Sequence, residues 1–188
     1  MATTGTGPGV QPPEFRAVMA QLASGVTVIM VSDPATGQPR GMTASAVMSV
    51  SLAPPLVVVS VRRQAHLHDA LARAGAYSVT VLGEHQEAQA CRFAGLPAGE
   101  RDEPPAFREA DGVPVLSGGL AWLVARITAA HPAGDHTLFV GKVTGLGADQ
   151  PRDPPLAFHR SAFARLAPLP PPAASVLHAW ENIRDMWG

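Results

Sequence analysis

Apolar residues along the chain mostly alternate with small or polar ones, or run continuously over short stretches, and both patterns are typical of β-strands. Helical spacing is less frequent. The pattern predicts strands over 26–31, 41–51, 56–61, 77–82, 120–130 and 137–146, and helices over 14–22, 67–74 and 84–93. Strands outnumber helices, and the long ones follow each other through short connections. The chain is therefore predicted to be mainly β, as a closed barrel with peripheral helices.

The stretch 41–51 places small hydroxyl side chains at regular intervals within an apolar strand pattern. Thr43, Ser45, Ser49 and Ser51 are all odd-numbered, so in one continuous strand they share a face. The prolines at 54–55 end this strand. The row of hydroxyls is thus expected to end at a rim that a flat polar ligand can reach. The alternative, favoured when this stretch is taken alone, is that small residues let a curved strand pack closely.

Two connections also have a predicted form. Residues 33–37, Asp-Pro-Ala-Thr-Gly, are typical of a turn, so the strands on either side form a hairpin or nearly do. Residues 95–112 contain three prolines and show no strand or helix pattern. Because long loops of this kind often serve as lids, we expect a cover over a site here.

Length and composition limit the functions that are open to the chain. Its 188 residues, 46% of them hydrophobic, suit one domain with a substantial core. The 14 basic and 15 acidic residues nearly balance, which argues against nucleic acid as a partner. Lys142 is the only lysine, and the arginines suit phosphate recognition. No apolar run approaches the roughly 20 residues that span a membrane, so no membrane association is expected.

The single cysteine, Cys91, cannot form an internal disulfide, and the first 13 residues carry no export signal. A cytoplasmic location is therefore expected. His66 and His68 lack the spacing of a zinc site with Cys91, so no metal is expected. No Gly-x-Gly-x-x-Gly motif follows a strand, so no Rossmann dinucleotide-binding unit is expected. The Gly-x-Ser-x-Gly motif of serine hydrolases is also absent, so a hydrolase is not expected.

Several segments, in order, resemble the short-chain flavin reductase family, the reductase components of two-component flavin-dependent monooxygenases. They are Gly41-x-Thr43-Ala44-Ser45, Ser49-Val50-Ser51, Pro54-Pro55, Arg92-Phe93-Ala94-Gly95, Gly134-Asp135-His136 and the stretch 155–163. The similarity covers roughly residues 14–166. It implies an FMN-binding split barrel that reduces free FAD or FMN with NADH or NADPH and supplies the product to a monooxygenase.

The resemblance also implies a flavin site. Backbone N–H groups around Ser49, Val50 and Ser51 would meet the polar edge of the isoalloxazine, where charge develops on reduction. The hydroxyls of Thr43 and Ser45 would contact the ribityl chain or the ring. Flavin-contacting residues expected from this segment are Met42, Thr43, Ala44, Ser45, Ser49, Val50, Ser51 and Ser60.

The loop after the third strand departs from the family pattern. Ala65 stands where the family usually has a hydroxyl, so phosphate binding would rest on Arg62, Arg63 and backbone donors, with His66 as a further candidate. The extra arginine favours FAD, whose bridging diphosphate would account for it, with FMN also accepted. The alternative is that the adjacent arginines are simply solvated.

By the same resemblance, His136 lies beside flavin and dinucleotide and is oriented by Asp135; these two are the expected catalytic residues. Phe158, His159, Arg160 and Phe163 are expected to contact nicotinamide or its phosphates, and Phe93 to pack over the flavin. Without a Rossmann unit, the dinucleotide would bind folded against the flavin.

The chain ends are predicted to lie outside the domain, which spans 14–166. Residues 1–13 form a disordered leader, and 167–188 contain a Pro-rich spacer and an amphipathic helix. The apolar stripe of that helix, Val176, Trp180, Ile183 and Trp187, would pack on its own barrel or on a second subunit. The family resemblance implies a homodimer.

Two alternative functions on the same barrel stay open. One is a flavin-binding or tetrapyrrole-binding protein that leaves NADH untouched. The other is an oxidase that consumes oxygen only when an organic substrate is added.

Overall fold

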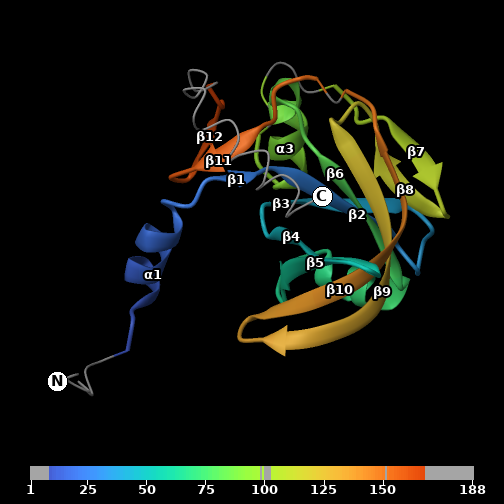
Figure 1. Ribbon diagram of the computed structural model, residues 1–188, viewed down its shortest axis with the longest axis horizontal. Coiled ribbons are helices and arrows are strands. Elements are labelled where there is room, and N and C mark those ends of the chain that lie inside the picture. Colours follow the sequence, from blue (N-terminus) through green and yellow to red (C-terminus); the bar gives the residue numbers. More distant parts are fainter. Residues whose placement is uncertain (1–8, 98, 100–102, 151, 168–188) are drawn as a thin grey trace, which may run out of the picture.

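The computed structural model describes residues 9–97, 99, 103–150 and 152–167. Its main element is one antiparallel seven-stranded sheet with the order β3-β2-β6-β9-β10-β5-β4 (Figure 1). The strands are β2 (Thr27–Ser32), β3 (Pro39–Ala44), β4 (Val47–Leu52), β5 (Pro55–Arg62), β6 (Ala76–Val81), β9 (Ala121–Ala133) and β10 (His136–Ala148). The prediction of a mainly β chain is confirmed.

The sheet must curl strongly, because its two edge strands are consecutive in the sequence. Seven flat strands would separate β3 from β4 by about 28 Å. Only Ser45 and Ala46 join them, and three Cα steps span at most about 11 Å. The edges therefore approach each other without pairing in the described sheet, so the barrel is split between β3 and β4, not closed by hydrogen bonds.

Smaller elements surround this sheet. They are α1 (Pro12–Met19), β1 (Ser24–Gly25), α2 (His68–Ala74), a 3₁₀ helix (Glu84–Gln86) continuing into α3 (Glu87–Phe93), β7 (Phe107–Ala110), β8 (Val113–Leu116), β11 (Ala157–His159) and β12 (Ala162–Ala164). Strands β1, β11 and β12 form a three-stranded sheet in that spatial order, and β7 pairs with β8. Figure 1 shows α1 standing apart from the sheets.

Strand β2 separates two parts of the core. Ile29 and Val31 face the barrel interior, where they join the buried Val57, Val59 and Val61 of β5. Its alternate residues, including Val28 and Met30, pack on the other side in a cluster that also contains Ala90 of α3 and Leu116 of β8. Both faces of this strand are therefore buried, which explains its continuous apolar run.

Several predicted elements have the expected form. The β2–β3 hairpin turns at Asp33, whose side-chain Oδ1 accepts a hydrogen bond from the backbone N of Ala35 at 2.9 Å. Helix α2 ends at Gly75, which has φ of 71° and supplies the left-handed cap. Helix α1 begins at Pro12 and ends at Met19, earlier at both ends than predicted, because Pro12 and Pro13 suit a first helical turn.

The prediction of a structureless lid over 95–112 was wrong for its second half. Residues 107–116 form the β7–β8 hairpin, turned by Asp111 and Gly112 with φ of 51° and 76°. Asp-Gly between alternating apolar residues is a strong hairpin signal. Val113 and Val115 are buried, so this hairpin is part of the core.

The predicted C-terminal spacer and helix, and most of the predicted leader, lie outside the described residues. Within the described part of the chain, no helix is long and apolar enough to cross a membrane. Among the same residues, no three His, Cys, Asp or Glu side chains are grouped to hold a metal ion.

Candidate functional site

The split between β3 and β4 places backbone donors and acceptors beside an exposed serine. Ser45 and Ala46 form the link between the strands, and Ser45 is exposed. The Thr27 hydroxyl donates to the carbonyl of Ala44 at 2.7 Å, and the backbone N of Ser60 donates to the carbonyl of Ala46 at 3.0 Å. These bonds hold the link to β2 on one side and to β5 on the other. The outer edges of β3 and β4 present backbone groups that a ligand can pair with.

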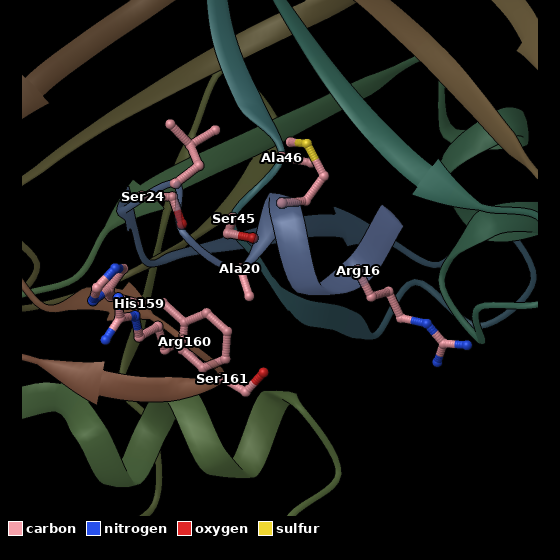
Figure 2. Close-up of a pocket in the computed structure, with 11 residues that line it drawn as sticks. Arg16, Ala20, Ser24, Ser45, Ala46, His159, Arg160 and Ser161 are labelled. Carbon is pink, nitrogen blue, oxygen red and sulfur yellow. The ribbon is translucent and has the colours of Figure 1, made fainter. Parts of the chain in front are cut away.

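A cavity of about 400 Å³ opens beside this link (Figure 2). Figure 2 shows Ser45 and Ala46 on one side of it and the turn 159–161 on the other. The lining residues are Arg16, Met19, Ala20, Leu22, Ser24, Ser45, Ala46, Phe158, His159, Arg160 and Ser161. Largely apolar walls with a few polar groups are typical of a site for a small organic molecule.

The turn that closes this cavity is strained. Arg160 and Ser161 connect β11 to β12 with φ of 50° and 62°, a left-handed conformation that side chains other than glycine's disfavour. The turn is fixed to the chain just after α1. Nε and Nη2 of Arg160 donate to Gln21 Oε1 at 2.9 and 2.8 Å, and the backbone N of Arg160 donates to the carbonyl of Ala20 at 2.9 Å. The Arg160 turn therefore positions α1 over the cavity.

A second cavity, of about 550 Å³, lies between α1 and the tip of the β9–β10 hairpin. It is lined by Pro12, Phe15, Arg16, Arg62, Asp135 and His136. Arg16 lines both cavities, so the two meet at α1. A ligand in each cavity would therefore lie close to the other.

Asp135 and His136 form a hydrogen-bonded pair at this hairpin tip. Gly134, with φ of 62°, allows the two-residue turn, and His136 stands opposite Arg62 of β5. Nδ1–H of His136 donates to Asp135 Oδ1 at 2.7 Å, and Arg62 Nε lies 3.6 Å from Asp135 Oδ2. The hydrogen bond from His136, together with the nearby charges, lowers the pKa of Asp135 below its ordinary value. Because the carboxylate engages Nδ1, Nε2 is the ring nitrogen available to a ligand.

The structure brings many of the predicted site residues together in two groups. Ser45, Phe158, His159 and Arg160 surround the first cavity, and Arg62, Asp135 and His136 the second. Arg63 adjoins the second group, since its backbone N donates to the carbonyl of Asp135 at 3.0 Å.

Predicted residues on and near β3 have contacts within the protein. The Thr43 hydroxyl donates to the carbonyl of Ala90 in α3 at 2.6 Å, and Met42 and Ala44 pack against the main core. His66 Nε2 lies within hydrogen-bond distance of the Gly41 carbonyl, at 3.1 Å.

The aromatic residues assigned to ligands also pack within the protein. The Phe93 ring lies against Gly41, where a Cβ would approach it to 3.0 Å, and meets Phe107 edge to face. Phe163 packs edge to face with Phe158 and lines a separate cavity of about 260 Å³. Ligand contacts of these residues stay predictions.

The prediction of a single row of hydroxyls was wrong. The break at 45–46 puts Thr43 on β3 and Ser49 and Ser51 on β4, at opposite ends of the strand order. An irregularity in the β4–β5 pairing also falls between Ser49 and Ser51, so these two do not keep a strict alternation. Ser49, Val50 and Ser51 lie on an edge strand, while Ser60 lies inside the sheet opposite Leu138.

Several lining residues of the two cavities were not assigned a role from the sequence, among them Arg16 and Ser161. Arg16 lines both cavities because α1 stands away from the barrel, a tertiary placement that helical periodicity does not reveal. Ser161 lines the first cavity, and its neighbours Phe158 and Arg160 were the signal that could have identified it.

Comparison with known proteins identifies the family. The family model described as flavin reductase like domain matches residues 19–167. The chain is 41% identical over 169 residues to the NADH:riboflavin 5'-phosphate oxidoreductase of Streptomyces pristinaespiralis, covering 89% of this chain and 95% of that one. It is 40% identical over 152 residues to the reductase component of 4-hydroxyphenylacetate 3-monooxygenase from Thermus thermophilus, and this match covers 81% of this chain and 95% of that one.

Among solved structures, the NADH:FAD oxidoreductase SgcE6 of Streptomyces globisporus C-1027 superimposes with a TM-score of 0.75. It is 33% identical, and the match covers 87% of this chain and 99% of that one. The sequence resemblance and the split barrel are thereby confirmed, and the chain belongs to the flavin reductase like domain family.

Proposed function

We propose that this protein is an NAD(P)H:flavin oxidoreductase that reduces free flavin and supplies it to a separate monooxygenase. The observation that carries the proposal is the pair of cavities that meet at α1 beside the split between β3 and β4. Two ligands held there would be neighbours, as transfer of a hydride between them requires. Relatives that share the family are named as NADH-dependent flavin oxidoreductases or as monooxygenase reductase components.

The residues around the first cavity fit a flavin. The isoalloxazine is flat and largely apolar, with one polar edge, and Met19, Leu22 and Phe158 supply apolar walls. The exposed Ser45 and the unpaired edge of β4 supply donors for the polar side. Arg16 and Arg160 add positive charge for the negative charge that develops on reduction.

When bound, the flavin accepts the hydride from the nicotinamide ring. The chain's own residues hold the reactants and protect the transfer from water. Edge-strand N–H groups stabilise the charge that develops on the isoalloxazine, and Nε2 of His136 contacts the dinucleotide. Asp135 is a positioning residue, because it holds Nδ1 and so fixes the ring's orientation.

FAD and NADH are the proposed preferred partners, with FMN as an alternative acceptor. Arg16 and Arg62 line the second cavity, and Arg63 lies beside it. Three arginines around one cavity suit a diphosphate better than a single phosphate. The relatives' names include both riboflavin 5'-phosphate and FAD, with NADH as the donor.

A homodimer is proposed because β4 exposes an apolar row on an edge strand. Met48, Val50 and Leu52 are all exposed in the single chain. An exposed apolar edge is prone to association unless it is covered, and a second copy would cover it. The flavin would then lie near the boundary between the subunits.

Initial rates of NADH and NADPH oxidation by the purified protein, each with FAD and with FMN, test this function. The proposal expects rapid oxidation that depends on added flavin, fastest with NADH and FAD. Flavin binding without oxidation of either dinucleotide would instead indicate the non-reducing binding protein. Oxygen consumption that needs a further organic substrate would indicate the oxidase.

A further inference from the structure

Three contacts hold the ring of His68, the first residue of helix α2. Its Nδ1 lies 3.0 Å from Asp69 Oδ1, and its Nε2 lies 2.9 Å from Thr137 Oγ1 of strand β10. The ring also meets Phe139 edge to face, with the centroids 5.6 Å apart. The His68 side chain is only 16% exposed. The ring is therefore fixed, with one nitrogen bonded within its own helix and the other to β10.

The two partners determine the direction of each hydrogen bond. The hydrogen bond from His68 lowers the pKa of Asp69 below its ordinary value. Because a carboxylate can only accept, Nδ1–H of His68 is the donor to Asp69. In the neutral ring, Nε2 then accepts from the Thr137 hydroxyl. A hydrogen-bonded chain thus runs from Asp69 through His68 to Thr137.

Helix α2 is a rigid base for this chain of bonds. Leu67 and Leu71, one turn apart, are fully buried in the main core. The backbone N of Leu71 donates to the carbonyl of Leu67 at 2.9 Å. His68 directly follows Leu67, so its backbone cannot shift without disturbing closely packed side chains.

Thr137 connects this base to the strand that carries His136. Thr137 pairs with the buried Val61 of β5, so its side chain lies on the barrel-facing side of the sheet. The preceding residue, His136, pairs with Arg62 and lies on the opposite side. The bond from His68 therefore holds β10 from inside the barrel, one residue away from His136.

The hairpin turn beyond this point is held by exposed contacts. Pairing with β5 ends at His136. Past it, Arg62 Nε lies 3.6 Å from Asp135 Oδ2 with both side chains exposed, and the backbone N of Arg63 donates to the carbonyl of Asp135 at 3.0 Å. Exposed ion pairs contribute little. The position of the His136 ring therefore depends on how firmly Thr137 is held.

We propose that His68 is a positioning residue for hydride transfer, because its bond to Thr137 keeps His136 in place at the second cavity. This inference rests on the proposed function, in which Nε2 of His136 contacts the dinucleotide. His68 is not among the residues that line either cavity, so it acts only through β10.

Two conservative variants separate the two bonds of the His68 ring. Glutamine places its amide about where Nε2 stands and can still bond Thr137, whereas asparagine places its amide about where Nδ1 stands and reaches only Asp69. His68→Asn should raise KM for NADH at least about threefold, as expected for the loss of one neutral hydrogen bond, and should change kcat and KM for flavin less than about twofold. His68→Gln should keep all three values within about twofold of those of the unmodified protein.

Variants of the partner residue test the same bond from the other side. Thr137→Val should reproduce the rise in KM for NADH, and Thr137→Ser, which keeps the hydroxyl, should not. Thr128→Val is the matched control, because the Thr128 hydroxyl donates to the carbonyl of Val140 at 3.2 Å on the same hairpin, away from His136. In a His136→Ala background, His68→Asn should add no further rise.

Hydrogen–deuterium exchange of residues 134–138 gives a readout that needs no activity. His68→Asn should speed exchange there, and His68→Gln should not. Equal KM values for NADH in the two His68 variants, an undiminished effect of His68→Asn in the His136→Ala background, or unchanged exchange in His68→Asn would overturn this inference alone. Absence of NADH oxidation by the unmodified protein would instead overturn the proposed function.

Discussion

The strained turn at Arg160 and Ser161 allows a prediction whose magnitude follows from the backbone. Each residue has positive φ, which costs an L-residue about 1–2 kcal/mol. Glycine removes that cost but adds about 0.5–1 kcal/mol of chain entropy to the unfolded state. Ser161→Gly should therefore raise the free energy of unfolding by about 0.5–1 kcal/mol. For a chain of this size the corresponding rise in Tm is about 1–4 °C.

Arg160→Gly gives the contrasting result, because it also removes the two hydrogen bonds to Gln21. These bonds are exposed and contribute roughly 1 kcal/mol at most, so the gain from relieved strain is offset and stability changes little. Freed from the turn, α1 should move more, and KM for flavin should rise several-fold in Arg160→Gly but not in Ser161→Gly.

Urea unfolding followed by circular dichroism, together with steady-state kinetics, measures both effects. Gln21→Ala should also raise KM for flavin, but by less than Arg160→Gly because it keeps the charge of Arg160, and it should add nothing further in an Arg160→Gly background. Destabilisation by Ser161→Gly, or an unchanged KM in Arg160→Gly, would refute the role given to this turn.

The remaining predictions concern packing, the ligand site and pH. Gly141→Val should destabilise the protein by about 1–3 kcal/mol in urea unfolding, because even a Cβ at this position would come within 2.8 Å of the Tyr77 hydroxyl. An unchanged urea midpoint would mean that the surrounding side chains rearrange to accommodate the valine, and would contradict this prediction. His136→Ala should raise KM for NADH more than KM for flavin without changing the urea midpoint, and unchanged kinetics would remove its role. Arg62→Glu should weaken flavin binding, measured by fluorescence quenching, more than NADH binding, and the opposite order would move the phosphate site elsewhere. Hydrogen bonds from the Ala35 backbone and from Arg40 lower the pKa of Asp33. The contribution of this carboxylate to the free energy of unfolding is therefore fully present above the ordinary carboxyl pKa and is lost as pH falls through the lowered pKa. The difference in urea midpoint between the unmodified protein and Asp33→Asn should accordingly shrink at acid pH, and a constant difference would contradict this coupling.

Local signals in the sequence identified most elements of the fold. The turn at Asp33 and the cap at Gly75 use side-chain and backbone chemistry contained within a few residues, so both could be predicted. The pair Asp135–His136 was also recognisable, because neighbours in a tight turn stay together whatever the rest of the fold does.

Features that depend on the curvature of the sheet could not be predicted in the same way. The two-residue interruption at Ser45 and Ala46 has no proline or charge to mark it, yet it moves Thr43 and Ser49 to opposite edges. The Asp111–Gly112 hairpin did carry a local signal, but the prolines before it drew the interpretation toward a loop.

A crystal structure of the full-length protein soaked with FAD would test the central claim most directly. The isoalloxazine should lie in the cavity beside Ser45 and the outer edge of β4, with its phosphates toward Arg62 and Arg63. Electron density for the flavin at another surface, or a cavity filled by the protein's own side chains, would contradict it.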